Sequence, residues 1–458
     1  MSTKENSIGN QNRELKRELS FRDIFFMSFG GQAPFLSMLT YATAVLLLSL
    51  YFSPMVVLIG TIVVLMNGLV VFFLSKRHTE TGGYFNYAIK ELSRWLGFET
   101  GWLYTFYSVL YASGYLAGSA FVLSYVLGVN PLFALLIAFI PASIFLLIGI
   151  KPSARYAIFA AAMEIVVLVG VIIVTLSVAH FSFYNPLGVP PSASSLFLGI
   201  LFAIGIPTGY GAITPVSGEV KNAEKNVGRA AIMVILIGGL LEALVLYGIV
   251  DAGISTGSLA SLTSSSVPVI SIMKEYIGPY SIYLLLFAGI NDGILGSLAF
   301  MTASSRNIYA MSRRKLLPEF LGKLHFRTGT PVIAGIVTII IASLVLFPSI
   351  ALFGVFTTFL ALGTLSGLGN LAIHLSANFS LLQSLKTAEG KRVLQGSIAL
   401  AAIAISGFVL VYSIATSVNY VILIFLGYII IGFLAVESLY GDFSREKHEI
   451  MDENGHKI

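Results

Sequence analysis

The chain has 458 residues, of which 56% are hydrophobic and only 11% are charged, with a net charge of +5. A soluble protein carries about 25% charged residues, because it must cover its outside with polar groups. Less than half of that fraction leaves too little polar surface for a globule in water. The composition therefore excludes a soluble protein and predicts a chain embedded in a bilayer.

The sequence contains no cysteine, which excludes disulfides, thiolate metal sites and cysteine nucleophiles. It opens on a polar stretch rather than on a short apolar run before a cleavage site, so we expect no removable signal peptide and a first span that is retained. Phosphate-binding loops, zinc-ligand spacings and nucleophile elbows are also missing. These gaps argue against an enzyme, and we expect no cofactor and no metal.

Apolar stretches recur along the whole chain. A helical span needs about 20 mostly apolar residues, and twelve such stretches follow one another between polar or Pro/Gly-rich segments. They cover residues 23–51, 54–75, 97–128, 130–150, 154–180, 195–217, 229–252, 279–311, 331–347, 350–375, 396–416 and 418–440. Because unpaired backbone groups are too costly in lipid, and barrel-type alternation is absent, the sequence predicts an all-α integral membrane protein with twelve transmembrane helices. Residues 1–22 and 441–458 are expected to form tails outside the membrane.

The basic residues are distributed unevenly over the loops. Of the 27 Lys and Arg residues, 26 lie in the two tails and in every second loop, and only Lys274 lies on the opposite side. Loops rich in Lys and Arg stay in the cytoplasm, so this split predicts an even number of spans in the cell membrane, with both termini cytoplasmic. It also explains the isoelectric point of about 9.1. We therefore expect no nucleic-acid partner, and the oligomeric state is left open.

Gly30, Gly31 and Pro34 interrupt the first apolar stretch. Proline lacks a backbone N–H and clashes with the preceding helical turn, and glycine adopts non-helical angles without steric cost. One interpretation is a kinked helix that packs through small residues, as is common in membranes. The other is a helix that is broken near the centre of the membrane.

The sixth stretch, FAIGIPTGYGAITPVSGE, is interrupted by Gly205, Pro207, Gly209, Gly211 and Pro215. Two interrupted spans that lie five spans apart are typical of an inverted five-helix repeat, in which the second copy enters the membrane with the opposite orientation. In such transporters the unwound amides and half-helix N-termini bind a carboxylate, and the free carbonyls bind an ammonium group or a cation. We therefore favour two broken helices and a carrier that works by alternating access.

Four motifs occur in the order that a known family shows. Residues 219–230, EVKNAEKNVGRA, resemble the signature E-x-K-N-P-x-x-N-x-P-R-A of amino acid permeases of the amino acid–polyamine–organocation superfamily. Residues 81–84, TGGY, resemble the family's P-x-G-G-x-Y, and residues 97–102, GFETGW, match the beginning of its third helix. Residues 305–331 resemble its S-R-x-x-Y-A … T-P stretch.

The resemblance implies a fold like that of the leucine transporter. Residues 23–180 would form a first repeat of five helices, residues 195–375 an inverted second repeat, and residues 396–440 two peripheral helices. It also implies that the cargo is an amino acid or a related amine, imported with a proton or with sodium, and held by both breaks. The positions that match the family's substrate contacts are Ser28, Phe29, Gly30, Gly31, Gln32, Ala33, Gly205, Ile206, Pro207, Thr208 and Gly209.

The sequence departs from the family pattern at the second break. The family has an aromatic residue near the positions of Gly205 and Pro207, and G-F-E/D where this chain has Gly209-Tyr210-Gly211. The outer aromatic lid over the substrate is therefore missing from its usual place. We expect Tyr210, or an aromatic residue of the third helix, to replace it.

The third helix carries a row of tyrosines. Tyr104, Tyr107, Tyr111 and Tyr115 are spaced three or four residues apart, so all four lie on one face of the helix. Packing is one explanation for such a row. The alternative is a gate or a substrate contact at Tyr107 or Tyr111, because the third helix flanks the site in the implied fold.

Three carboxylic acids, Glu164, Glu242 and Asp292, lie within apolar stretches. A charged carboxylate in the membrane centre costs about 2.5–3.5 kcal/mol, so each one needs an explanation. Some proton-coupled relatives carry a lysine near the position of Glu164, and we interpret this residue as the candidate carrier of the coupling proton; a structural glutamic acid and a cation site are the alternatives. Asp292 would face a cationic substrate or line a watery vestibule, and Glu242 would pair with a polar neighbour.

Other functions compete with amino acid import. The three buried acids motivate a polyamine or organic-cation transporter, and an exchanger would have the same fold. A channel or a sensor would be equally hydrophobic, but neither predicts two helix breaks five spans apart. We therefore favour a proton-coupled amino acid permease, and leave the identity of the amino acid open.

Overall fold

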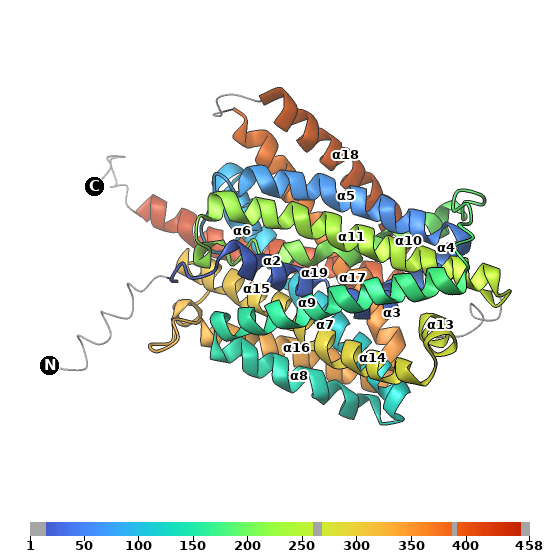
Figure 1. Cartoon of the computed structure of the whole chain (residues 1–458). Coiled ribbons are helices and arrows are strands. Elements are labelled where there is room, and N and C mark those ends of the chain that lie inside the picture. The colour runs from blue at the N-terminus through green and yellow to red at the C-terminus, as the bar shows by residue number, and fades with distance from the viewer. Residues whose placement is uncertain (1–14, 260–267, 387–391, 450–458) are drawn as a thin grey trace.

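The computed structural model describes residues 15–259, 268–386 and 392–449. Within these residues the regular structure is helical, apart from an isolated parallel bridge between Leu19 and Val220. The predicted all-α class is confirmed. The long helices run side by side along a common direction in one bundle (Figure 1). Much of the two predicted tails, residues 1–14 and 450–458, lies outside the described residues.

The helices follow the predicted apolar stretches closely. The first half of the chain forms α2 (Phe21–Gly31), α3 (Pro34–Leu39), α4 (Tyr41–Ser49), η1 (Leu50–Phe52), α5 (Ser53–Leu74), α6 (Tyr84–Glu91), α7 (Arg94–Leu127), α8 (Pro131–Ile148), α9 (Ile150–Val178), α10 (Ala193–Gly205), η2 (Ile206–Ala212) and η3 (Ser217–Glu219). The second half forms α11 (Ala223–Ser255), α13 (Pro268–Ile277), η4 (Gly278–Tyr280), α14 (Ser281–Phe287), η5 (Ala288–Asp292), α15 (Gly293–Arg313), η6 (Glu319–Gly322), α16 (Val332–Phe353), α17 (Val355–Ser384), α18 (Arg392–Thr416) and α19 (Asn419–Glu449).

Eleven helical stretches of the described residues are long and apolar enough to cross a membrane. This number treats Tyr41–Leu74 as one stretch of 34 residues. Within it α4 ends at Ser49, and Leu50 adopts a left-handed φ of 43° before α5 begins. The predicted count of twelve instead joins α2, α3 and α4 into a first span and takes α5 as the second. The multi-pass membrane character is thus shown, while the count of twelve remains a prediction.

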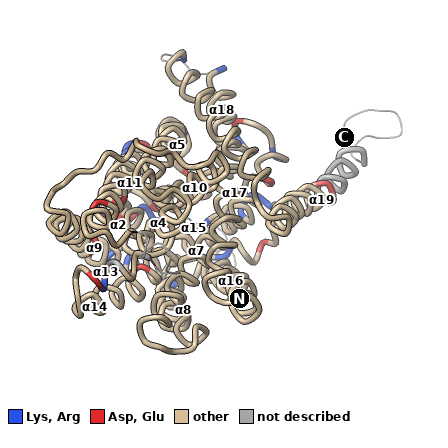
Figure 2. The backbone as a smooth tube through the Cα atoms, turned by 90° about the vertical axis from the view of Figure 1, so that its right-hand side faces the viewer, with Lys and Arg blue, Asp and Glu red and all other residues tan. Residues whose placement is uncertain are grey.

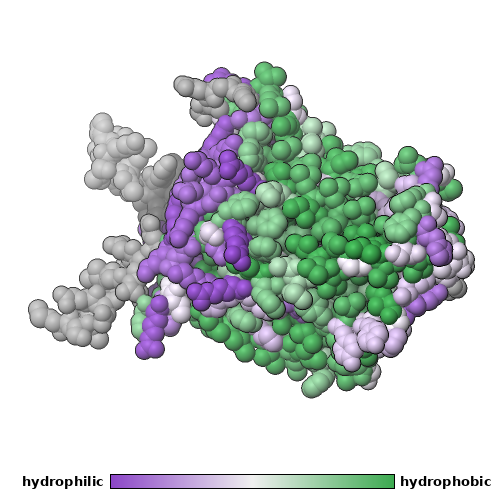
Figure 3. Space-filling model, viewed as in Figure 1, coloured by the Kyte–Doolittle hydropathy of each residue, from purple (hydrophilic) through white to green (hydrophobic). Residues whose placement is uncertain are grey.

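An apolar belt surrounds the bundle. Figure 3 shows a broad hydrophobic band between hydrophilic zones at the two ends of the molecule. Large exposed apolar side chains such as Phe159, Leu344 and Leu423 belong to α9, α16 and α19. Because lipid tails are as apolar as a leucine side chain, these side chains are suited to face a bilayer.

The helices divide into a central and a peripheral set. Most side chains of α7 and α10 are buried, whereas only about a fifth of those in the apolar stretches of α16 and α19 are buried. Seen nearly end-on, α18 and α19 lie at the edge of the bundle, and α4, α7, α10 and α15 surround its centre (Figure 2). Here the inner end denotes the end at which α2 begins, and the outer end the one at which α4 ends (Figure 1).

Candidate functional site

The first apolar stretch is broken between α2 and α3. Gly30 and Gly31 remain helical, and the break falls one step later than the glycines predict, at Gln32 and Ala33. Ala33 has a left-handed φ of 43° and directly precedes Pro34, the first residue of α3. A proline disfavours the α conformation of the residue before it, so the proline rather than the glycines decides where the helix breaks.

The second break follows α10. The α-helix ends at Gly205 and continues as the 3-10 helix η2, in which Pro207 has the non-helical angles φ −84° and ψ 21°. After Ala212 the chain turns twice before α11 begins. This is the Gly/Pro-rich segment that the sequence singled out.

The two breaks contact each other in the buried centre of the molecule. All eleven residues predicted to hold the substrate are buried. A side chain at Gly209 would overlap the carbonyl oxygen of Ser28, so only glycine allows this approach. The fold therefore brings together the two sets of residues that the resemblance assigned to one site.

The tyrosines of α7 line both breaks. The Tyr104 hydroxyl donates to the Gly211 carbonyl over 2.8 Å, the Tyr111 hydroxyl donates to the Gly205 carbonyl, and the Tyr115 hydroxyl donates to the Gln32 carbonyl. A helix break leaves carbonyls without an intrahelical partner, and these three hydroxyls supply one. The Tyr107 hydroxyl is buried and has no hydrogen-bond partner. The row is thus part of the candidate site rather than general packing.

Tyr41, the first residue of α4, packs its ring against Gly205, near which the family pattern expects an aromatic residue. A Cβ atom at Gly205 would lie 3.0 Å from the Tyr41 ring. The ring stacks on Tyr111 at 6.1 Å between centroids and meets Phe359 edge-on at 5.1 Å. The expectation that Tyr210 or an aromatic residue of the third helix supplies the lid stays a prediction, and Tyr41 of α4 is a further aromatic residue at Gly205.

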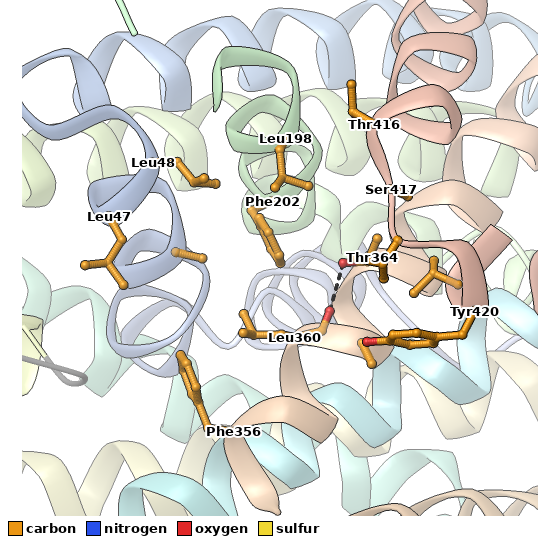
Figure 4. A pocket seen from close by; sticks show the side chains of 14 residues that line it. Leu47, Leu48, Leu198, Phe202, Phe356, Leu360, Thr364, Thr416, Ser417 and Tyr420 are labelled. Carbon is orange, nitrogen blue, oxygen red and sulfur yellow. Dashed lines mark hydrogen bonds between the residues drawn. The ribbon is translucent and has the colours of Figure 1, made fainter. Parts of the chain in front are cut away.

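Tyr41 separates two cavities. The outer pocket has an empty volume of about 880 Å³ and is lined by residues of α4, α10, α17 and the α18–α19 turn, among them Phe202 and Ser417 (Figure 4). A smaller cavity of about 180 Å³ lies among Tyr107, Thr208 and other residues of α7, the second break and α17. The Tyr41 ring packs against Gly205 and Gly363 of the small cavity and lies 6.4 Å from Phe202 of the outer pocket.

Tyr210 lies toward the inner end. Its hydroxyl is 2.5 Å from Nε2 of His374 on α17, and the hydroxyl of Tyr84, the first residue of α6, is 3.0 Å from the same nitrogen. Nδ1 of His374 faces the Asn370 carbonyl at 2.7 Å and must donate to it, so in the neutral imidazole Nε2 is the acceptor, and its single lone pair faces both tyrosine hydroxyls. The sequence-based prediction of the site did not include His374; a histidine inside the largely apolar run GLGNLAIHL is the signal that could have indicated it.

A buried ion pair and several main-chain hydrogen bonds connect segments at the inner end. The Arg306 guanidinium binds both carboxylate oxygens of Glu219, over 3.0 and 3.2 Å, and both side chains are buried. The amides of Glu18 and Leu19 donate to the Glu219 carbonyl, and the Lys221 amide donates to the Leu19 carbonyl, over 2.8–2.9 Å. The E-x-K-N and S-R motifs, far apart in the sequence, thus meet in one junction.

The three acids of the apolar stretches lie near one another. The Asn291 side-chain amide donates to Glu164 Oε1 over 2.6 Å and to Asp292 Oδ1 over 3.3 Å. Asp292 Oδ2 accepts the backbone N–H of Leu36 over 2.7 Å, which ties it to the first break. Glu164 Oε2 and both oxygens of Glu242 are buried without a hydrogen-bond partner. Asp292 therefore touches the first break directly, and Glu164 contacts Asp292 both through Asn291 and through its own carboxyl group.

Two contacting helix breaks inside an apolar helix bundle define a multi-pass membrane protein with a buried polar centre. The family model described as "Amino acid permease" matches residues 23–442 of the chain. The chain therefore belongs to the amino acid permease family. Membership of a permease family indicates a transporter of small molecules rather than an enzyme.

Three curated relatives are likewise named as transporters or permeases. The chain is 27% identical to a methylthioribose transporter of Bacillus subtilis over 42% of each protein. It is 25% identical to a branched-chain amino acid permease of Lactococcus lactis, over 58% of this chain and 55% of the relative. It is also 27% identical to an uncharacterized amino-acid permease of Schizosaccharomyces pombe, over 35% of this chain and 28% of the relative. The matched parts thus span about half or less of each relative's length.

Proposed function

We propose that the protein is a secondary permease that imports amino acids across the cell membrane by alternating access and with proton coupling. The observation that carries this proposal is the contact between two buried helix breaks in a chain of the amino acid permease family. Irregular backbone at the depth of the membrane centre is tolerated where it lines a cavity or is buried in protein, and in carriers it forms the substrate site.

The proposed architecture is that of two inverted repeats. Residues 23–180 form the first and residues 195–375 the second, with residues 396–440 as two peripheral helices and both termini in the cytoplasm. The position of α18 and α19 at the edge of the bundle supports the peripheral assignment (Figure 2). The presence of one break early in each half supports the repeat.

The proposed substrate site lies between the two breaks and α7. Ser28 Oγ, Tyr107 Oη and Asn370 Nδ2 are buried there without hydrogen-bond partners. A buried polar group that lacks a partner costs about 1–3 kcal/mol, so a bound amino acid that supplies partners gains affinity. The small cavity, which Tyr107 and Asn370 line, is the space from which such a site would open.

The proposed gates lie on either side of this cavity. Tyr41, with Tyr111 and Phe359 against its ring, closes the outer side. The Tyr84–His374–Tyr210 cluster and the Arg306–Glu219 pair close the inner side. Alternating access then requires that one set of contacts separates while the other holds.

We assign the coupling proton to the acid cluster, with Glu164 as its carrier and sodium as the alternative ion. A buried carboxylate with one unpartnered oxygen is costly to keep charged, which favours proton uptake from one side and release to the other. Asp292, bonded to the first break, provides the link between protonation and the substrate site.

Transport by the purified protein in liposomes tests the proposal. We expect an inside-alkaline gradient to drive saturable uptake of at least one labelled L-amino acid, with counterflow, and a protonophore to abolish accumulation. Leucine, isoleucine and valine come first in the panel, because one relative is named a branched-chain amino acid permease. Non-saturable conductance without counterflow would instead identify a channel.

The acid cluster favours a second candidate, a transporter of polyamines or organic cations. Three buried acids would attract a cargo with a positive charge and no carboxylate. Competition by putrescine against a labelled amino acid in the same liposomes separates the two. Strong competition by putrescine, with none among amino acids, would favour the second candidate.

A further inference from the structure

The backbone amides of the first break are already in use. The Gln32 and Ala33 amides donate back into α2 over 3.0 and 2.9 Å, and the Ser37 amide bonds within α3 over 2.8 Å. Pro34 has no N–H. Only two amides in the first turn of α3 are left for a partner outside the break.

Both of these amides are directed at Asp292. The Leu36 N–H donates to Oδ2 over 2.7 Å, and the Phe35 amide approaches the same carboxylate. Asp292 is the last residue of the π-helical turn η5 and is fully buried. A carboxylate from another part of the chain thus binds the two free amides in the first turn of α3.

We propose that Asp292 is a built-in substitute for the substrate's carboxylate. It holds the two amides while the site is empty, and a substrate's carboxylate takes them over only when Asp292 has bound a proton. This inference rests on the proposed function, because it assumes that amino acids bind at the breaks. It differs from a purely structural cap, which would hold α3 in the same way whatever ligand is bound.

The physical reason is competition for the same donors. Hydrogen bonds to a charged acceptor are about twice as strong as those between neutral groups, so a protonated Asp292 is displaced more easily than a charged one. One proton then enters with each substrate carboxylate, and the charge at the break is unchanged. An amine without a carboxylate does not compete for the amides, and the charged Asp292 attracts it.

Among the described residues around Asp292, no basic side chain supplies a positive charge that would take the place of the proton. Helices α3 and α8 pack on η5 and carry no titratable side chain. Tyr283 of α14 is exposed, and the Tyr115 hydroxyl of α7 donates to the first break. The titratable groups that face Asp292 are Glu164 and Tyr156 of α9 and Glu242 of α11. The positive charge at this place is therefore a proton or the substrate's ammonium group.

Matched ligands test the inference on the purified full-length protein. The probes are the L-amino acids that bind the wild type and the amines that correspond to their decarboxylation, such as isopentylamine for leucine and cadaverine for lysine. We expect Asp292→Asn to raise the affinity for the amino acid about tenfold and to lower that for the amine about tenfold, because a neutral amide is a weaker acceptor and a weaker counter-charge. Glu242→Gln, which removes a buried acid that does not touch the amides, is the control.

Opposite shifts for the two ligands in Asp292→Asn, absent from Glu242→Gln, support the inference. Equal shifts, or a loss of affinity for the amino acid, would overturn it and leave Asp292 as a structural cap. If Asp292→Asn does not fold, the wild type itself carries the test: between pH 8 and pH 5 the affinity ratio of amino acid to amine must rise about tenfold or more. If no amino acid binds the wild type at all, the proposed function fails rather than this inference.

Discussion

The Tyr41 ring packs against Gly205, near which the family pattern expects an aromatic residue of the second break itself. Gly205, in the second break, leaves the space, and the ring enters it from the start of α4. The side chain thereby stands between the outer pocket and the small cavity without lining either. Its removal should open a path between the two.

The absence of cysteine makes this opening measurable with a single introduced thiol. Ser366 lines the small cavity and is buried, whereas Ser417 lines the outer pocket (Figure 4). We expect a bulky, water-soluble thiol reagent to leave Ser366→Cys unlabelled and to label it about tenfold faster when Tyr41→Ala is added. Ser417→Cys, as control, should react equally in both backgrounds. Equal protection of Ser366→Cys in both would mean that Tyr41 is not the lid.

The buried Arg306–Glu219 pair also makes a prediction for single residues. Removing one partner leaves a buried charge uncompensated, which typically costs about 3–5 kcal/mol, whereas replacing both with apolar residues is often neutral. We expect Arg306→Met to lower the midpoint of thermal unfolding in detergent strongly, and Arg306→Met with Glu219→Met to recover most of the loss. A double variant as unstable as the single one would show that the pair contributes through its shape rather than its charge.

At the scale of elements, two neighbouring tyrosines of α7 have different relations to the helix breaks. The Tyr111 hydroxyl holds the Gly205 carbonyl, while the Tyr107 hydroxyl has no partner. Tyr111→Phe should therefore destabilise the empty protein by about 1–3 kcal/mol, the cost of a buried carbonyl without a donor. Tyr107→Phe should leave its stability unchanged and weaken substrate binding.

Thermal unfolding of both variants, with and without the substrate found in liposomes, checks this division. Each variant serves as the control for the other, because both lose a tyrosine hydroxyl group from α7, one helical turn apart. If Tyr107→Phe binds the substrate as tightly as the wild type, Tyr107 is not a substrate contact. If Tyr111→Phe is as stable as the wild type, the carbonyl does not need its hydroxyl.

The helices and their breaks could be predicted because they depend on local composition. Apolar runs long enough to span lipid, and Gly or Pro inside two of them, are read directly from the sequence. The residue at which the first helix breaks was predicted slightly too early, since the restriction that Pro34 imposes on Ala33 outweighs the freedom of the glycines.

Side chains that reach the site from elsewhere in the chain could not be predicted. Nothing near Tyr41 or His374 in the sequence reveals that the one meets Gly205 and the other Tyr210. Such contacts depend on how helices pack, and that is decided by many weak contacts rather than by a local pattern. The binding roles assigned to the eleven break residues remain predictions for the same reason.

At the scale of the whole molecule, the proposed alternating access requires that proton coupling decides which end opens. The acid cluster joins α9, η5 and the first break through Asn291 and Asp292. We expect Glu164→Gln to keep substrate exchange in liposomes but to lose accumulation driven by a pH gradient, because a neutral side chain cannot carry the proton. Glu242→Gln, which leaves these bonds intact, serves as control. Undiminished gradient-driven uptake by Glu164→Gln would remove it from the coupling path.

Main-chain hydrogen bonds join Glu18 and Leu19, which precede α2, to Glu219 and Lys221, which precede α11. These bonds form a strap between the two segments. Exchanging the side chains of Glu18 or Lys221 leaves these bonds in place, so alanine scanning would overlook the strap. Shortening the chain through Leu19 would remove all three bonds, and introducing a proline at Leu19 would remove the N–H that this residue donates to Glu219. A permease trimmed or rigidly fused at this point would then be biased toward opening at its inner end, although each residue of its transport path is unaltered.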